Sequence, residues 1–97
     1  MPNINYNSAE IIDYPVSNEE LGIDDPFLAD SDCLLKITFK KSKNFPIGYI
    51  LRGYDTIKLG ISTNFSSSVY VPLNVTDWFY FDNNYDQIST IIKYEYE

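Results

Sequence analysis

Histidine and cysteine, which commonly perform acid–base, nucleophilic or metal chemistry, are scarce in this sequence of 97 residues. There is no histidine, which removes the usual proton-transfer group near pH 7, the histidine-containing catalytic triads and the histidine metal sites. The single cysteine, Cys33, follows Asp32, whose charge raises a thiol pKa, and precedes the apolar Leu34. One cysteine forms neither an internal disulfide nor a zinc site. We therefore interpret Cys33 as a buried structural residue.

Neighbouring carboxylates are the remaining candidates for catalysis. The pairs Asp24-Asp25 and Asp30 with Asp32 contain the residue type that supplies both acid and base in glycoside hydrolysis. Such pairs need a deep cleft to separate their pKa values, and a chain of this length rarely provides one. We expect solvated acidic loops here and no enzymatic activity.

One segment partly matches a calcium-binding loop. Residues 82–86 (Asp-Asn-Asn-Tyr-Asp) fit the first three ligand positions of an EF-hand. Gln87 then stands where the sharp turn needs glycine, and Lys93 stands where the bidentate glutamate belongs. No glycine-rich phosphate loop is present either. The sequence therefore predicts no metal and no cofactor.

Charge is distributed unevenly along the chain. Residues 1–35 carry eight acidic side chains and neither Lys nor Arg, residues 36–58 carry six cations and only Asp55, and the remainder carries five acids and Lys93. The net charge is −7 and the isoelectric point is about 4.3. This partition is typical of a protein that presents negative charge to a cationic partner.

The basic segment 36–58 combines cations with Tyr49 and Tyr54, the residue types with which proteins bind single-stranded nucleic acid. The overall acidity argues against that role. We expect instead that the acidic N-terminal residues lie beside the basic strands and that each screens the other. No direct binding of nucleic acid is predicted.

The elements that must position these residues change in character near residue 32. Residues 1–31 contain apolar pairs without a sustained period, three prolines, and a capping box at residues 17–20 that predicts one short helix. We interpret this region as an irregular acidic arm. Residues 32–97 form the β-sheet core, and the whole chain is one domain.

Period-2 alternation predicts strands throughout residues 32–97. In residues 33–41, Leu35, Ile37 and Phe39 share the predicted inner face. Residues 47, 49 and 51 form the next such set and residues 57, 59 and 61 the one after it, on either side of a tight reversal at 53–55. Residues 69–75 form a strand that Pro72 confines to an edge or a bulge. Residues 78–81 and 88–96 complete the set, and in the last of these the even-numbered residues from Ile88 to Tyr96 alternate against the odd-numbered ones, which include Ile91 and Lys93.

About six strands joined by turns predict a mainly β fold, an antiparallel meander curled into a small sandwich or half-barrel. The alternative is an α+β fold with a helix within residues 77–92, where Asp77 would be the N-cap. No signal peptide and no apolar span of bilayer length are visible, so a cytoplasmic protein that does not enter membranes is expected.

These features together predict a small acidic non-enzymatic inhibitor, namely a bacterial immunity protein or antitoxin that blocks a basic toxin such as a nuclease. Its carboxylates would stand in for phosphates, and it would act as a monomer or weak homodimer. The expected partner-binding residues are acids of the arm and of the loop near residue 84, together with two tyrosines: Glu19, Glu20, Asp24, Asp25, Asp30, Asp32, Asp82, Asp86, Tyr14 and Tyr85.

Two other functions fit the same residues. A phage anti-defence inhibitor (anti-CRISPR-like, or a DNA mimic) would use the same acidic surface. A structural or accessory module would instead bind its partner through the edge of the final strand, residues 91–97.

Overall fold

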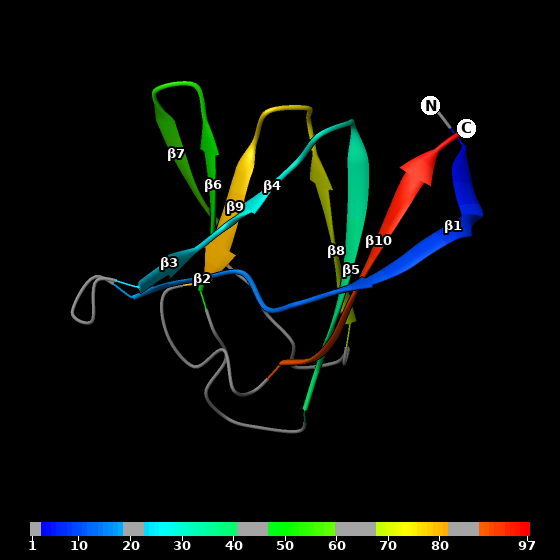
Figure 1. Ribbon diagram of the computed structural model, residues 1–97, viewed down its shortest axis with the longest axis horizontal. Coiled ribbons are helices and arrows are strands. Elements are labelled where there is room, and N and C mark those ends of the chain that lie inside the picture. Colours follow the sequence, from blue (N-terminus) through cyan, green and yellow to red (C-terminus); the bar gives the residue numbers. More distant parts are fainter. Residues whose placement is uncertain (1–2, 19–22, 41–46, 60–67, 82–87) are drawn as a thin grey trace.

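The computed structural model describes residues 3–18, 23–40, 47–59, 68–81 and 88–97. In these residues the chain forms ten strands and no helix, and the strands assemble into two sheets (Figure 1). The predicted mainly β class is confirmed. None of the described residues belongs to a helix that is long and apolar enough to cross a membrane.

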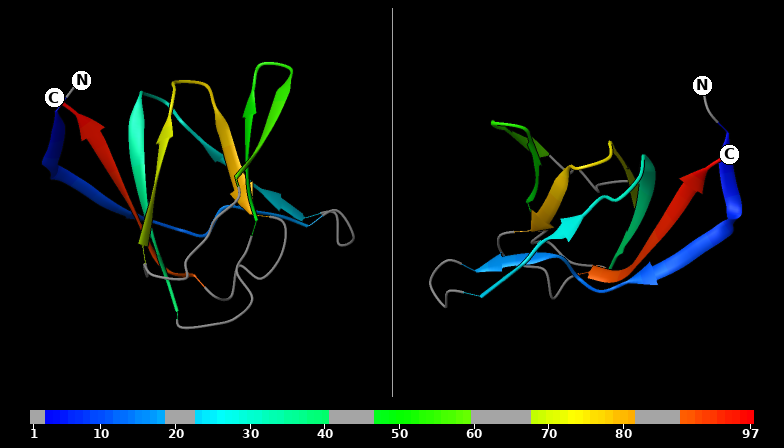
Figure 2. Two further views of the ribbon diagram at one scale, coloured as in Figure 1. Left: turned by 180° about the vertical axis from the view of Figure 1, so that it is seen from behind. Right: turned by 45° about the horizontal axis from the view of Figure 1, so that its top comes forward.

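Sheet A is antiparallel throughout and holds the last strand in its interior. Its order is β1, β10, β5, β8, so that β10 pairs with β1 on one side and with β5 on the other. Both views of Figure 2 show β1 beside β10 along one side of the molecule. The strands are β1 (Ile4–Ile12), β5 (Cys33–Phe39), β8 (Ser68–Leu73) and β10 (Ile88–Tyr96).

Sheet B has the order β3, β2, β9, β6, β7, with β4 also paired to β9. Its pairings are antiparallel except that of β2 with β9, where Val16 lies opposite Phe81 in parallel orientation. The strands are β2 (Val16–Asn18), β3 (Ile23–Asp25), β4 (Phe27–Leu28), β6 (Gly48–Arg52), β7 (Asp55–Leu59) and β9 (Trp78–Phe81).

The core lies between the two sheets. Leu35 and Ile37 of β5 are fully buried, as the alternation in residues 33–41 predicts. Phe79 and Phe81 of β9 are also fully buried, and their rings meet edge to face with centroids 5.0 Å apart. Side chains from both sheets thus form one apolar cluster, which makes the fold a sandwich.

Several other strand predictions are confirmed. The reversal after β6 is a turn at residues 53–54, in which Gly53 adopts a φ of 61° that favours glycine. Pro72 lies in β8, which is an edge strand of sheet A among the described residues, as the missing N–H of proline predicts. Residues 78–81 are a strand, and Asp77 precedes it without capping a helix; residues 82–87 lie outside the described part.

The face of β6 is the reverse of the predicted one. Tyr49 and Leu51 were expected inside, but Gly48 and Ile50 are the buried residues. A side chain at residue 48 would meet the ring of Phe79 at 3.2 Å, so the glycine allows this ring to lie against the strand. Because both faces of β6 carry apolar residues, alternation alone gave the wrong side.

β10 also departs from simple alternation. Ile91 was expected on the same face as Lys93 and opposite Ile88, yet Ile88 and Ile91 are both fully buried. The register of β10 against β5 shifts between Ile88 and Thr90. This irregularity moves Ile91 to the core face, and it leaves Ile92 on the outer face.

The N-terminal region is more regular than predicted, since residues 1–31 contribute four strands to the two sheets. β1 shifts register between Asn5 and Glu10, and β2 to β4 have two or three residues each, so none of them shows a visible period. Of the predicted helix at 17–20, residues 17 and 18 belong to β2, and residues 19 and 20 lie outside the described part.

The sheet orders also correct two topological expectations. Neighbours in each sheet are mostly distant in sequence, so the fold is not a meander. The final strand is not an edge either, because β10 is paired on both sides. The backbone donors and acceptors of residues 91–95 are therefore unsuited to pairing with a partner strand.

Candidate functional site

Three carboxylates gather around one ammonium group in sheet A, and a fourth lies close to one of them in sequence. The Lys93 Nζ lies 3.0 Å from Glu95, 3.6 Å from Asp30 and 3.8 Å from Glu10. Asp32 is two residues from Asp30 in the β4–β5 loop. We call Glu10, Asp30, Asp32 and Glu95 the acidic cap. With Lys93 included, the cap retains three negative charges.

The register of sheet A positions the carboxylates that come from strands. Glu10 of β1 lies directly opposite Lys93 of β10, and Glu95 follows Lys93 on the same face. This is the inner face, because Ile91, two residues before Lys93, lies in the core. Lys93 therefore lies where the core gives way to solvent, with a side chain only 12% exposed.

The β4–β5 loop supplies the other two carboxylates and is fixed at both ends. The Ser31 hydroxyl donates to Glu95 at 2.5 Å, and the Val75 amide donates to Asp32 at 2.9 Å. Ala29 exchanges two backbone hydrogen bonds with the turn that precedes β9. Asp30 itself remains 81% exposed and Glu10 64% exposed, so both are accessible to a partner.

The pKa values of the two most closely bonded groups in the cap follow from these contacts. The Ser31 hydroxyl and then the Lys93 ammonium lower the pKa of Glu95. Burial of Lys93 lowers its pKa, but the hydrogen bond from Lys93 to Glu95 and the charges of Glu95, Asp30 and Glu10 outweigh it and raise the pKa overall. Glu95 and Lys93 are therefore both charged at neutral pH.

A second ion pair has a structural role. Asp77 is 2% exposed, and its carboxylate accepts hydrogen bonds from the Arg52 guanidinium, the shortest at 2.7 Å. It also accepts from the Asn74 amide at 2.8 Å. The same turn holds Thr76 at a φ of 72°, unusual for a β-branched residue. Asp77 therefore fixes the β8–β9 turn, to which the β4–β5 loop is bound.

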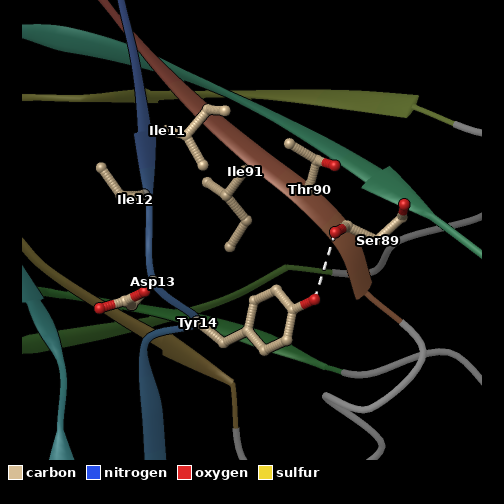
Figure 3. Close-up of a pocket in the computed structure, with 7 residues that line it drawn as sticks. All are labelled: Ile11, Ile12, Asp13, Tyr14, Ser89, Thr90 and Ile91. Carbon is tan, nitrogen blue, oxygen red and sulfur yellow. Dashed lines mark hydrogen bonds between the residues drawn. The ribbon is translucent and has the colours of Figure 1, made fainter.

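A surface hollow opens where β1 leaves β10. Its volume is about 270 Å³, and it is lined by Ile11, Ile12, Asp13, Tyr14 and residues 89–91. Figure 3 shows the Tyr14 ring reaching toward β10, where its hydroxyl donates to the Ser89 carbonyl at 3.2 Å. Asp13 points to the other side of the strand (Figure 3). Ile11 is 77% exposed although it is aliphatic.

The structure brings together only some of the predicted site residues. Asp30 and Asp32 share the acidic cap, whereas Asp24 and Asp25 lie on β3 in sheet B, and Tyr14 lines the hollow. The sequence reasoning did not find Glu10, Glu95 or Lys93. Alternation in β10 signals that Lys93 and Glu95 share a face, but Glu10 requires the β1 register. The other predicted residues lie outside the described part: Glu19, Glu20, Asp82, Tyr85 and Asp86.

The expected screening between the acidic arm and the basic strands stays a prediction, because Glu19, Glu20, Lys41 and Lys43 lie outside the described residues. Within the described residues, the ion pairs of the arm join Glu10 and Asp30 to Lys93, which lies outside the basic segment. Cations of residues 36–58 are dispersed: Lys36 lies on the outer face of sheet A, Lys58 on β7 of sheet B, and Arg52 is bound to Asp77. These three form no common cationic groove of the kind that single-strand binders use.

Cys33 is buried, as predicted. It is fully inaccessible, and burial together with the charge of Glu95 raises its pKa to about 11. A thiol that is buried and protonated at neutral pH reacts slowly. We expect that a thiol reagent such as Ellman's reagent will leave the folded protein unlabelled for hours at pH 7.5 and will label it fully in denaturant. Rapid labelling of the folded protein would contradict this burial.

The described residues contain no group of three or more side chains that would hold a metal ion. Their perturbed carboxylates, Asp77 and Glu95, are each bound to a cation and lie in separate places, so they do not form an acid–base pair. No protein-family model matches the sequence, and comparisons with curated proteins and with solved structures found no significant match.

Proposed function

We propose that the protein is a non-enzymatic inhibitor that binds a basic protein, as bacterial immunity proteins bind and block cytoplasmic toxins such as nucleases. The observation that carries the proposal is the acidic cap, in which Glu10, Asp30 and Glu95 lie 3.0–3.8 Å from a single ammonium and Asp32 follows two residues after Asp30 in the β4–β5 loop. In this role the carboxylates occupy positions that substrate phosphates take in the cationic cleft of the partner.

The fold does not require so many carboxylates at one place. An exposed ion pair contributes about 0–1 kcal/mol to stability, and Glu95 alone already satisfies Lys93 at 3.0 Å. Asp30 and Glu10 lie farther from Lys93, are largely exposed and repel one another. Solubility alone would be served equally well by acids spread over the surface. Their concentration supports a binding role, because opposed potentials speed association.

The test is a capture experiment with a charge-matched control. The protein is immobilised and exposed to a lysate of the native host, and bound proteins are identified by mass spectrometry. We expect a basic protein whose activity an equimolar amount of this protein abolishes. The double variant Asp30→Asn/Asp32→Asn should recover it about tenfold less efficiently, since hot-spot losses exceed about 1 kcal/mol. The asparagine side chain introduced at position 32 retains an oxygen that accepts from the Val75 amide.

The control is Asp13→Asn/Asp55→Asn, which removes two exposed charges outside the cap and outside the predicted partner-binding residues. It should change recovery by less than about twofold. Equal losses in both double variants would show that net charge alone drives capture, and an uninhibited partner would contradict the inhibitory role. A toxin gene beside the coding gene favours immunity, whereas a phage early operon favours anti-defence.

A further inference from the structure

We propose that Arg52 and Asp77 are positioning residues, which hold the β4–β5 loop so that Asp30 and Asp32 are presented to the basic partner protein. The inference rests on the proposed function and concerns how the acidic cap keeps its geometry. Arg52 ends β6 and Asp77 immediately precedes β9, so this ion pair lies at the end of sheet B. Lys93, around which the cap is built, belongs to sheet A.

The turn at residues 74–77 contains a residue that does not favour its backbone conformation. The Asp77 amide donates to the Asn74 carbonyl at 3.0 Å, and Thr76, the third residue of the turn, has a φ of 72°. A turn with a positive φ at its third residue usually has glycine or asparagine there, because a β-branched side chain crowds the left-handed backbone. The Asp77 carboxylate offsets this by accepting from the Asn74 amide, and Arg52 holds that carboxylate with three hydrogen bonds of 2.7–3.2 Å.

The backbone amides of this turn fix the β4–β5 loop on both sides of Asp30. Before Asp30, the Ala29 carbonyl accepts from the Thr76 amide at 2.7 Å, and the Ala29 amide donates back to the turn at 2.9 Å. After it, the Asp32 carboxylate accepts from the Val75 amide at 2.9 Å. Because Ala29 is buried while Asp30 and Asp32 are exposed, these three bonds determine where the two carboxylates enter the solvent.

Charge and position make opposite predictions for the removal of Arg52. Arg52→Gln removes one cation and takes the net charge from −7 to −8, which strengthens the attraction for a cationic probe. Loss of the ion pair instead releases the turn and lets Asp30 and Asp32 spread apart, which lowers the local density of negative charge. Lys58→Gln is the matched control, because Lys58 is an exposed cation on β7, a strand that β6 separates from β9.

The first test follows the Val75 amide of the ¹⁵N-labelled protein at neutral pH. Asp32→Asn changes a charged acceptor into a neutral one, so we expect it to move the Val75 amide proton signal upfield. In the Arg52→Gln background the same substitution should leave this signal in place, because the turn no longer directs the amide at residue 32. Thr76→Gly added to Arg52→Gln should restore the response, since glycine adopts a φ of 72° without strain. Thr76→Gly also offsets lost stability, so the response is measurable even where Arg52→Gln alone unfolds.

The second test adds a short oligoarginine peptide at low ionic strength and measures its affinity from the amide shifts of residues 29–32. We expect Arg52→Gln to bind the peptide about threefold more weakly than the wild-type protein. Lys58→Gln carries the same net charge as Arg52→Gln and should bind the peptide at least as tightly as the wild-type protein. Thr76→Gly/Arg52→Gln should recover the wild-type affinity.

Three outcomes overturn the inference: the Val75 signal responds to Asp32→Asn equally with and without Arg52→Gln, Thr76→Gly fails to restore the response, or Arg52→Gln and Lys58→Gln bind the peptide equally well. Failure of the proposed function gives a different pattern. If the peptide leaves the signals of residues 29–32 unshifted in the wild-type protein, then the acidic cap is not a cation-binding surface. The Val75 response still decides whether Arg52 and Asp77 position the loop.

Discussion

Replacing Asp77 with alanine is expected to lower the free energy of unfolding by about 2–4 kcal/mol. The Asp77 carboxylate is 2% exposed and accepts from both the Arg52 guanidinium and the Asn74 amide, so truncation leaves the amide without its acceptor. The left-handed backbone of Thr76 then loses the contacts that hold it. Urea denaturation followed by tryptophan fluorescence measures the effect, because Trp78 is the next residue.

Arg52→Gln is the companion variant, and it should be destabilising to a similar extent, since it leaves the 2% exposed Asp77 carboxylate without its cation and with the Asn74 amide as a remaining donor. Acid should reveal the same interaction. The hydrogen bonds from Arg52 hold the pKa of Asp77 below its ordinary value, so the stabilisation is complete above about pH 4 and is lost as the pH falls through the folded-state pKa. An Asp77→Asn variant should lack this part of the acid sensitivity. Equal sensitivity in both proteins would contradict the role of the Asp77 pair.

Ile91→Ala is expected to destabilise the protein by about 2–5 kcal/mol, and Ile92→Ala by about 1 kcal/mol or less. Ile91 is fully buried in the core, whereas Ile92 is half-buried on the outer face of sheet A. The two changes delete the same atoms from neighbouring residues, so the comparison isolates the face that each occupies. Denaturant unfolding of both variants measures it.

The pair also tests the irregularity in β10. Uninterrupted alternation from Ile88 places Ile92 in the core and Ile91 outside, which is the prediction that the sequence alone supports. The register shift between Ile88 and Thr90 reverses this assignment. A larger loss for Ile92→Ala than for Ile91→Ala would mean that the shift does not occur in the folded protein.

Sequence reasoning succeeded where one face of a strand is apolar and the other polar. The alternation of Leu35 and Ile37 with Lys36 and Thr38 is clear in β5, and both the leucine and the isoleucine are buried. Sequence reasoning failed in β6, where the neighbouring residues Tyr49 and Ile50 are both apolar enough for the inner face. The contact that decides between them is that of Gly48 with the Phe79 ring, and it joins two strands that are distant in sequence. Local periodicity carries no information about such a neighbour.

The candidate site shows the same division. The excess of acid and the exposure of Asp30 follow from composition and from the loop position, and both were predicted. The contact between Glu10 and Lys93 joins residues 83 positions apart, through a strand pair whose β1 register shifts after Asn5. Asp77 was considered only as a helix cap, because its partner Arg52 lies in another strand. Long-range register decides each of these cases.

The interior position of β10 has a consequence for how the chain acquires its structure. Every residue pairing of β1, from Ile4 with Tyr96 to Ile12 with Ile91, joins residues separated by most of the chain. No two neighbouring strands of sheet A are consecutive in sequence, so forming this sheet requires the closure of very large loops. During synthesis β1 emerges from the ribosome long before its partner in sheet A exists. Folding in milliseconds to seconds, as for other proteins rich in non-local strand pairs, is therefore expected, together with a period in which the nascent chain depends on chaperones.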